Sequence, residues 1–452
     1  MAVATNAKWL LLMPGRLRAR LESRPNAMKF AGNSAWLLFD KLIRLVLGLL
    51  VSAWMARYLG PSQFGELSYV LAYIAFFQVA ATLGLDSIVV RDIARDPASA
   101  PQTLGTVFAL RLAAGVSCWL LAIGGMVAAD GWSGPLVLLT ALVGAVVVFQ
   151  PADTIDLWFQ SQSESRRTVI AKLLAYLLSS ALKIGLILAA APLAAFAAAL
   201  AFDAIGAAVG LMLAYRRFPA AGRWTAIRHR GRQLLQECWP LLLSGVLVIT
   251  YMRIDQLMLK KILGERELGI YVAALSLSQM WHAIPMIVSV SLLPVATALR
   301  RRSQDEYIQL MTMVFRYHFL IAALISLLVA FASPFLIRHL FGPHYSEAAA
   351  VLRVHVFSNI FVFAGVAHSV WLTAEGRTKV RLVGTLIAGV CSVAGNFILI
   401  PELGVVGPAY VAVVSMFIAA VGINYFLAPD SFRMQLAALW LGAGPLKVRS
   451  PK

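Results

Sequence analysis

Charged residues are scarce in this sequence. They make up 13% of its 452 residues, whereas soluble domains contain roughly a quarter. Acidic residues are especially few, at 21 against 39 Lys and Arg residues, and hydrophobic residues make up 60% of the chain. A soluble fold this apolar would precipitate, so the composition excludes a water-soluble protein.

Cysteine is rarer still. The three cysteines, Cys118, Cys238 and Cys391, fall in three different apolar stretches and show no CxxC spacing. This pattern argues against a disulfide framework and against a metal site. We expect no metal and no bound cofactor.

The chain consists instead of a succession of apolar runs, each of about 20 residues, which is the length that crosses ~30 Å of hydrocarbon. We predict an all-α integral membrane protein with about twelve spanning helices. The predicted spans are residues 33–57, 65–85, 104–128, 135–159, 168–190, 193–215, 234–259, 268–295, 311–337, 348–373, 380–400 and 405–427. The mean hydropathy of +0.79 agrees with this fold class.

The formal net charge of +18 follows from membrane topology. An even number of spans places both termini on one side, and the basic residues gather at the termini and in alternate loops. This asymmetry satisfies the positive-inside rule when both termini are cytoplasmic. We therefore expect no nucleic-acid partner. The loops on the opposite side are short and leave little room for a catalytic domain.

The N-terminus does not resemble a signal peptide. Its apolar run WLLLM is shorter than a normal h-region and is followed by more arginines. Residues 1–32 are instead predicted to form a basic cytoplasmic arm at the membrane interface. The arginines of this arm are Arg16, Arg18, Arg20 and Arg24. An alternative is that translation starts at Met28, where the first span needs to begin.

The basic stretch RRFPAAGRWTAIRHRGRQ, residues 216–233, lies near the middle of the chain. It is typical of a cytoplasmic linker between two lobes. We expect a first six-helix lobe at residues 33–215 and a second at 234–427, followed by a basic cytoplasmic tail at 428–452.

An internal repeat supports this division. YLGPSQFGELSY at residues 58–69 and ILGERELGIYVA at residues 262–273 share Leu-Gly, followed by an apolar residue and a second Gly. Pro192 and Pro401 recur at a similar offset. Two pseudo-symmetric lobes with a site between them are a common transporter plan.

Several charged residues lie inside the predicted spans, where each costs ~2.5–3.5 kcal/mol at mid-helix unless it pairs, reaches the surface or lines water. Our candidates for substrate-binding cations in a cavity are Lys41, Arg44, Arg111, Lys183 and Arg253. Asp40 precedes Arg44 by four residues, so an ion pair within the helix is the alternative for Arg44.

The fifth span carries a polar stripe. Lys172, Tyr176, Ser179 and Lys183 follow one another at i, i+4, i+7 and i+11, which places them on one helix face. We interpret this face as a cavity wall. Lys172 lies near the cytoplasmic end and could reach the surface instead.

Arg253 and Asp255 are two residues apart and point to nearly opposite faces, so they cannot pair within one helix. We expect one to face the space between the lobes and the other a neighbouring helix. Asp86 is predicted to be the N-cap of the segment SIVVRDIAR.

Acidic residues and one histidine in the spans are candidates for ion coupling, because burial can let such groups carry protons. They are Asp153, Asp156, Asp203, Asp255 and His282. A hydrogen bond to a neighbouring helix would explain the presence of each of these residues in a span equally well. The basic residues would suit an anionic head group, because Arg and Lys donate charge-assisted hydrogen bonds to phosphate.

Five stretches, in this order, resemble one family. They are DLWFQSQSESR, RIDQLMLKKILGERELGIYVAA, SLLP, LFGPHYSEAAAVLRV and WLTAEGRTKV with the following NFILIPELGVVGPAYVAVVS. Together they resemble O-antigen-type polysaccharide flippases of the bacterial multidrug/oligosaccharidyl-lipid/polysaccharide (MOP) superfamily, over residues 30–425. The resemblance implies a two-lobed, MATE-like helix bundle that alternates access.

The function that the resemblance implies is transport without covalent chemistry. A polyprenyl-pyrophosphate-linked oligosaccharide would move from the cytoplasmic to the outer leaflet of the bacterial inner membrane, for O-antigen, capsule or exopolysaccharide synthesis. A cationic cavity would hold the substrate, and an H+ or Na+ gradient would drive transport. Membrane lipid, a polysaccharide polymerase and a chain-length regulator are the expected partners.

Three other functions are weighed against this one. A multidrug exporter of the same superfamily would share the fold, but a cavity for cationic drugs should favour carboxylates over Arg and Lys. A lipid II flippase usually has more than twelve helices. An integral membrane glycosyltransferase or polymerase would need catalytic groups in a substantial loop.

Overall fold

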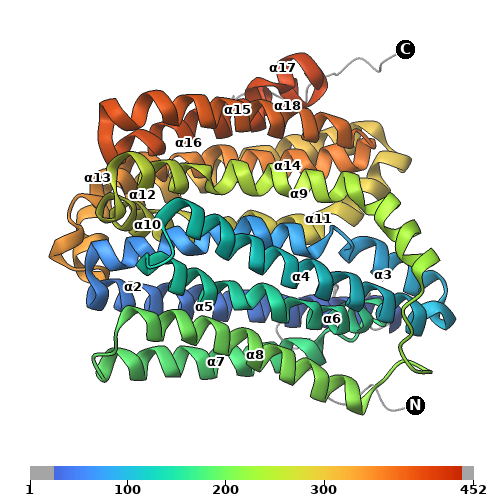
Figure 1. Cartoon of the computed structure of the whole chain (residues 1–452). Coiled ribbons are helices and arrows are strands. Elements are labelled where there is room, and N and C mark those ends of the chain that lie inside the picture. Colours follow the sequence, from blue (N-terminus) through green and yellow to red (C-terminus); the bar gives the residue numbers. More distant parts are fainter. Residues whose placement is uncertain (1–24, 440–452) are drawn as a thin grey trace.

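The computed structural model describes residues 25–439, and every regular element within them is a helix (Figure 1). The earlier helices are α2 (Pro25–Thr82), α3 (Asp86–Arg95), α4 (Ala100–Asp130), α5 (Pro135–Phe149), α6 (Asp153–Ser161), α7 (Arg166–Leu188) and α8 (Leu193–Arg217). Residues 1–24, with the four arginines of the predicted arm, lie outside the described residues, as do residues 440–452. Helix α2 already begins at Pro25, ahead of Met28.

The later helices begin after a loop that ends at Ile227. They are α9 (Arg228–Leu263), α10 (Glu265–Gln279), α11 (Ala283–Arg302), α12 (Gln304–Leu340), α13 (Ala348–His355), α14 (Ser358–Glu375), α15 (Thr378–Leu403), α16 (Gly407–Phe417), α17 (Asn424–Leu427) and α18 (Pro429–Leu439). The described part of the predicted tail is therefore largely helical, and α18 packs against α12.

Ten stretches of the described chain are long and apolar enough to cross a membrane. Two of them, Phe39–Arg95 and Val380–Leu427, are interrupted at a glycine with positive φ, Gly60 or Gly404. Each of these two supplies two crossings, which brings the total to about twelve. The prediction of an all-α membrane fold is confirmed.

The first glycine of each repeat copy lies at a tight turn. Gly60 has φ 73° and separates two arms of α2, residues 25–59 and 61–82; Gly264 has φ 102° and joins α9 to α10. A residue with a side chain rarely adopts positive φ, whereas glycine does so freely. The shared Leu-Gly of the repeat therefore has a structural cause in both copies.

The second glycine of each copy lies where α2 crosses α10. A Cβ atom on Gly65 would lie 1.8 Å from the Glu265 carbonyl oxygen, and one on Gly269 would lie 2.0 Å from the Pro61 carbonyl oxygen. Only a hydrogen atom fits at either position. The two copies of the repeat thus pack against each other, backbone to backbone. We call this end of the bundle, with its four repeat glycines, the glycine end.

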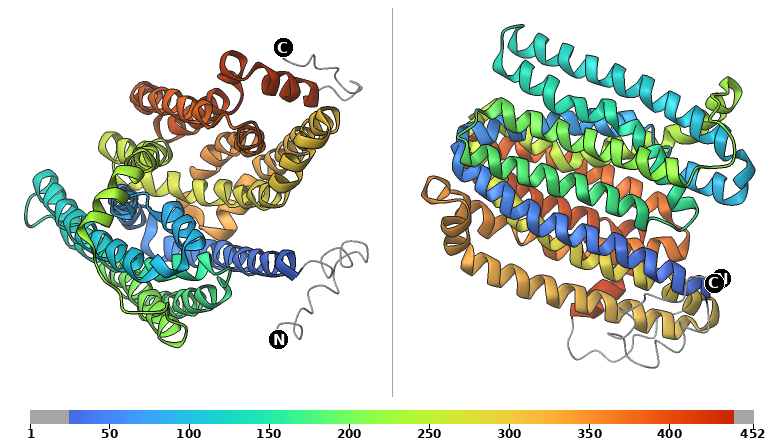
Figure 2. Two further views of the ribbon diagram at one scale, coloured as in Figure 1. Left: turned by 90° about the vertical axis from the view of Figure 1, so that its right-hand side faces the viewer. Right: turned by 90° about the horizontal axis from the view of Figure 1, so that it is seen from below.

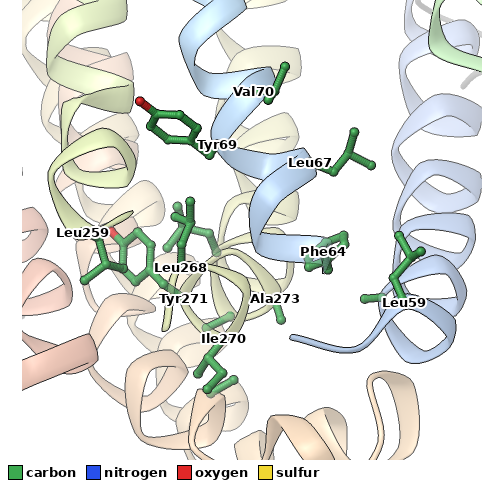
Figure 3. Packing of buried hydrophobic residues seen from close by; sticks show 14 of the residues in the cluster. Leu59, Phe64, Leu67, Tyr69, Val70, Leu259, Leu268, Ile270, Tyr271 and Ala273 are labelled. Carbon is green, nitrogen blue, oxygen red and sulfur yellow. The ribbon is translucent and has the colours of Figure 1, made fainter. Parts of the chain in front are cut away.

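Buried apolar side chains join the two predicted lobes at the glycine end. One continuous core contains Phe64 and Leu67 of α2 together with Leu268 and Tyr271 of α10 (Figure 3). Close packing of this kind excludes water. The glycine end is therefore closed.

Polar contacts also cross between the lobes at this end. The buried Tyr345 hydroxyl donates a hydrogen bond of 2.8 Å to the Ala56 carbonyl oxygen of α2. The Lys260 ammonium of α9 lies 4.9 Å from the centre of the Tyr69 ring of α2. These contacts tie α2 to α9 and to the short turn Pro343–Tyr345 between α12 and α13.

Toward the other end of the bundle the described cores are separate. One cluster packs α11, α12, α14 and α18 around Tyr307, Met311 and Trp371. Another packs α3 and α4 with the start of α9, around Leu85 and Leu104. Among residues 25–439, only the start of α9 joins helices of the two predicted lobes in a buried cluster here, whereas the cluster of α11, α12, α14 and α18 contains no residue of the first lobe.

Helix α9 contacts both groups of helices. Its first turns belong to the core with α3 and α4, and the Arg91 guanidinium of α3 pairs with Glu237 at 2.8 Å. Helix α9 also packs against α15 and α2. In the left view of Figure 2 the blue-to-green helices lie largely on one side and the yellow-to-red helices on the other. A division of the chain into two lobes at residues 216–233 stays a prediction.

Candidate functional site

A cavity of about 450 Å³ lies inside the first group of helices, between α2, α5, α7, α8 and the start of α6. Its charged lining residues are Asp40 and Arg44 of α2, Asp153 of α6, Lys172 of α7 and Asp203 of α8. Ionisable groups inside a membrane bundle are costly and are usually retained for function. This cavity is therefore the candidate site.

Arg44 is held in the cavity wall by neighbours on two helices. Its Nε–H group donates to Asp40 Oδ1 at 2.8 Å, and its Cζ atom lies 4.7 Å from the centre of the Tyr176 ring. The Tyr176 hydroxyl in turn donates to the Arg44 carbonyl oxygen at 3.2 Å. Within the described residues the two Nη groups make no hydrogen bond. Arg44 thus has an ion pair and also unused donors.

Lys172 forms a three-residue ion cluster with two aspartates. Its ammonium lies 2.7 Å from Asp153 Oδ1 and 2.8 Å from Asp156 Oδ2. The break Gln150–Ala152 between α5 and α6 starts α6 at Asp153, and one turn of α6 then brings both carboxylates to α7. Two of the predicted ion-coupling residues are therefore partners of one lysine.

Lys183 lies on the same face of α7 as Lys172, but it is only 8% exposed. No carboxylate of the described chain lies within 4.0 Å of its ammonium, although α8, which carries Asp203, packs against α7. Between these lysines, the Ser179 hydroxyl donates to the Ala199 carbonyl oxygen of α8 at 3.1 Å. The predicted stripe therefore faces the inside of the helix bundle, and only Lys172 lines the cavity.

This cavity carries charges of both signs. Its lining holds two cations, Arg44 and Lys172, and three aspartates. The exposed Lys41 is not among the lining residues. The cavity is therefore mixed in charge, because Asp40 on the same helix as Arg44 and two aspartates on other helices accompany the basic residues.

Arg111 lies away from the cavity and forms an ion pair. Its side chain is 2% exposed, and Nη2 donates to Asp86 Oδ1 at 2.6 Å and to the Thr82 carbonyl oxygen at 3.3 Å. The predicted N-cap role of Asp86 is wrong, because α3 begins at Asp86 itself and Leu85 is the N-cap. The carboxylate meets Arg111 instead.

Arg253 and Asp255 have separate partners, as their spacing requires. Arg253 Nη1 donates to Gln256 Oε1 on its own helix at 3.3 Å. Asp255 accepts a hydrogen bond of 2.5 Å from the Tyr271 hydroxyl of α10, so it is the residue that faces a neighbouring helix. Neither lies in the lining of the cavity described above.

His282 belongs to a polar network in the later helices. Its Nε2 atom lies 2.8 Å from Asn359 Oδ1, the Asn359 amide donates to the Ser278 carbonyl oxygen at 3.1 Å, and the Ser278 hydroxyl lies 2.8 Å from His355 Nδ1. Of these four residues, only His282 is predicted from the sequence as a candidate site residue. The spacings Ser278 to His282 and His355 to Asn359 are both i, i+4. The sequence therefore shows two pairs of polar residues, but it does not show that the two pairs contact each other.

Metal ligands do not gather in the described chain. No group of three or more His, Cys, Asp and Glu side chains in residues 25–439 could hold a metal ion. The cavity can instead offer hydrogen bonds and charge to a ligand.

Comparisons with known proteins identify the family. A family described as "Polysaccharide biosynthesis protein" matches residues 54–350. The capsular polysaccharide biosynthesis protein CapF of Staphylococcus aureus is 23% identical over 188 residues, which cover 41% of this chain and 48% of CapF. The match thus spans about half the length of this curated relative.

Solved structures of membrane transporters share the fold. An inward-facing multidrug-resistance MATE transporter of the MOP superfamily has a TM-score of 0.68 at 17% identity, covering 89% of this chain and 98% of the transporter. The lipid II flippase MurJ in an inward closed conformation has a TM-score of 0.65 at 14% identity, covering 90% of each chain. Because the family match extends over more than half of the sequence, this chain belongs to the polysaccharide biosynthesis protein family, and it has the fold of MOP superfamily transporters.

Proposed function

We propose that this protein is a flippase that moves a polyprenyl-pyrophosphate-linked oligosaccharide from the cytoplasmic to the outer leaflet of the bacterial inner membrane. The unit would serve the synthesis of a surface polysaccharide such as O-antigen, capsule or exopolysaccharide. Family membership and the MOP fold support transport in glycan synthesis. We infer from the geometry of the site that the substrate is lipid-linked.

The inference of a phosphate-bearing substrate rests on Arg44. Its Nε group is taken by Asp40, whereas both Nη groups are unused at the wall of a cavity inside the membrane bundle. The two Nη groups of a guanidinium match two oxygens of a phosphate in a bidentate arrangement. Asp40 and the Tyr176 ring fix the guanidinium without occupying that edge.

The packing supports an alternating-access mechanism. The lobes share a core at the glycine end, whereas at the other end the core of α11, α12, α14 and α18 is separate and only the start of α9 packs against α3 and α4. With both termini in the cytoplasm, the glycine end faces outward, so this conformation would receive substrate from the cytoplasmic leaflet. Substrate or ion binding would then shift the population toward the opposite state. A polymerase and a chain-length regulator would act on the product.

The test uses a strain lacking the gene. Such cells should accumulate the lipid-linked unit in the cytoplasmic leaflet and lose surface glycan, and the intact gene should restore it. Arg44→Ala is expected to reduce transport at least tenfold, because charge-assisted hydrogen bonds contribute about 1.5–3 kcal/mol. Surface glycan is measured per copy of protein in the membrane.

Arg44→Lys is the matched control, since it retains the charge and the pairing with Asp40. It lacks the two Nη groups that can bind two phosphate oxygens at once. We expect its transport to fall between the wild type and Arg44→Ala. Full transport by Arg44→Ala at normal protein levels would contradict the role of Arg44. Normal surface glycan in the deletion strain would contradict the function itself.

The mixed charge of the cavity supports a second candidate, the export of cationic amphiphiles. Asp40, Asp153 and Asp203 all line the cavity, and a cation would favour such carboxylates. In that case the deletion strain should keep its glycan and become sensitive to cationic drugs. Asp203→Asn should then reproduce the sensitivity, because Asp203 lies beyond 4.0 Å from every described cation.

A further inference from the structure

Helices α7 and α8 form an antiparallel pair at one edge of the bundle (Figure 1). Their connection lies at the glycine end, because the Tyr58 hydroxyl of α2 donates to the Ala191 carbonyl oxygen at 2.9 Å. The pair is tightly packed, since a Cβ atom added to Gly210 of α8 would lie 3.2 Å from the Ala171 Cβ atom of α7. The start of α7 and the end of α8 therefore lie together at the opposite end of the bundle.

An exposed stripe on each of these helices leads to an arginine at this end. The exposed residues of the stripe on α7 are Arg166, Ile170, Leu174 and Leu178, and those on α8 are Ile205, Val209, Met212 and Arg216. Steps of three or four residues keep each set on one helix face. In a membrane-spanning bundle these apolar faces contact lipid chains, and an arginine at the end of such a face reaches the headgroups.

Arginines gather at the ends of the two helices. Arg166 and Arg167 start α7, and Arg216 and Arg217 end α8. Arg167 is neutralised, because its Nε atom lies 2.8 Å from Glu164 Oε2. No carboxylate of the described chain lies within 4.0 Å of the other three guanidiniums. This end of the helix pair thus carries an excess of positive charge directly above apolar side chains.

Aromatic rings hold two of these guanidiniums in place. The Arg166 Cζ atom lies 5.0 Å from the centre of the Trp36 ring of α2, and the Arg167 Cζ atom lies 3.1 Å from the centre of the Phe218 ring. Phe218 is itself fixed, because the Trp158 Nε1–H group donates to its carbonyl oxygen at 3.3 Å. Contact with a ring occupies the face of a guanidinium and leaves the N–H edge of Arg166 available for phosphate oxygens.

The helix dipole explains only half of this cluster. Cations are favourable at the C-terminus of a helix, which suits Arg216 and Arg217. At the N-terminus they are unfavourable, yet the first turn of α7 contains Arg166 and Arg167 and no acidic residue. A phosphate group beside these arginines would remove that cost.

We propose that the ends of α7 and α8 away from the glycine end bind the headgroup of an anionic phospholipid, whose acyl chains lie along the two apolar stripes. Guanidiniums above an apolar face match the phosphate and acyl chains of a phospholipid in both chemistry and order. An acidic protein or a soluble phosphate would leave the apolar stripes unused. With both termini in the cytoplasm, this lipid belongs to the cytoplasmic leaflet. The inference goes beyond the proposed function and does not depend on it.

The lipid site and the cavity lie on opposite sides of α7. Ile170 belongs to the exposed stripe, whereas Lys172 lines the cavity. Residues two apart point to nearly opposite faces of a helix. A phospholipid bound at Arg166 would therefore steady, from outside, the helix that carries Lys172.

Native mass spectrometry of the full chain tests the site. The protein is purified in an uncharged detergent and mixed with equal amounts of a phosphatidylglycerol and a phosphatidylcholine that have the same acyl chains. We expect phosphatidylglycerol to be preferred at least about tenfold, because each arginine near an anionic lipid contributes roughly fivefold in affinity. The preference should shrink as the salt concentration rises from about 0.1 M to about 1 M, since the Debye length shortens from about 10 Å to about 3 Å.

Two matched double variants locate the binding. Arg216→Gln/Arg217→Gln should lower the preference at least about fivefold. Arg301→Gln/Arg302→Gln removes two adjacent exposed arginines from the last turn of α11, where no aromatic ring of the described chain contacts them, and should change it less than about twofold. If the first double variant does not purify, Arg166→Gln alone must lower the preference at least about twofold.

Equal binding of the two lipids by the parent would overturn the site, and so would an unchanged preference in Arg216→Gln/Arg217→Gln. Undecaprenyl pyrophosphate is the third probe. If it displaces phosphatidylglycerol from the parent at equal concentration, these arginines bind the pyrophosphate of a prenyl lipid, and the assignment to a phospholipid is wrong.

Discussion

Replacing Gly269 with alanine is expected to reduce transport at least about fivefold and to open the glycine end. The new Cβ atom would lie 2.0 Å from the Pro61 carbonyl oxygen. A backbone oxygen in a helix cannot move aside as the end of a side chain can, so α2 and α10 must separate. Overpacking of this kind costs about 1–3 kcal/mol, which corresponds to a population shift of roughly 5- to 150-fold.

Two measurements check this prediction. Surface glycan reports transport, and labelling of Ala273→Cys by an external maleimide reports the opening of the shared core. Gly65→Ala should behave like Gly269→Ala, because its Cβ atom would meet the Glu265 carbonyl oxygen at 1.8 Å.

Gly389→Ala is the matched control. Gly389 lies in α15, and no atom outside its own helix lies within 4 Å of an added Cβ atom. This variant should keep transport and labelling, and alanine's helix propensity should stabilise it by up to about 1 kcal/mol. Equal effects at Gly389 and Gly269 would mean that the crossing of α2 and α10 has no special role.

Asp86→Ala is expected to destabilise the protein far more than Arg111→Leu, although the two residues form one ion pair. Arg111 is 2% exposed, whereas Asp86 is 60% exposed. Removing Asp86 leaves a buried guanidinium with no carboxylate, a change that costs about 3–5 kcal/mol in buried pairs. The remaining bond to the Thr82 carbonyl oxygen places the expected cost at the lower end of that range.

Removing Arg111 leaves a carboxylate that water can solvate, and leucine fills much of the vacated space. The double variant Asp86→Ala/Arg111→Leu should therefore recover most of the stability that Asp86→Ala loses. Thermal unfolding in detergent and the amount of protein in the membrane are the measurements. Equal losses from both single variants would contradict this asymmetry. Normal transport by Arg111→Leu would show that Arg111 does not bind the substrate.

The repeat glycines show how far sequence reasoning can reach. The pattern Leu-Gly followed by an apolar residue and Gly predicted a repeated element, because identical local geometry demands the same residue twice. It did not predict that Gly65 and Gly269 pack on each other. That contact depends on two segments about two hundred residues apart meeting at one crossing.

The intramembrane charges show where sequence reasoning stops. The pairing of Asp40 with Arg44 follows from an i, i+4 spacing within one helix and was weighed from the sequence. The partners of Lys172, Arg111 and Asp255 lie on other helices and could not be assigned. The cavity within the first group of helices is mixed in charge, and a cationic site between the lobes stays a prediction.

The sequence by itself determined the membrane class, the approximate number of crossings, the repeated glycine pattern and the resemblance to one superfamily, because hydropathy, residue pattern and motif order are properties of contiguous residues. Only the tertiary structure decided which charges are neutralised, which end of the bundle is closed and which helix breaks face each other. These depend on how helices distant along the chain are placed in space, and no local pattern encodes that placement.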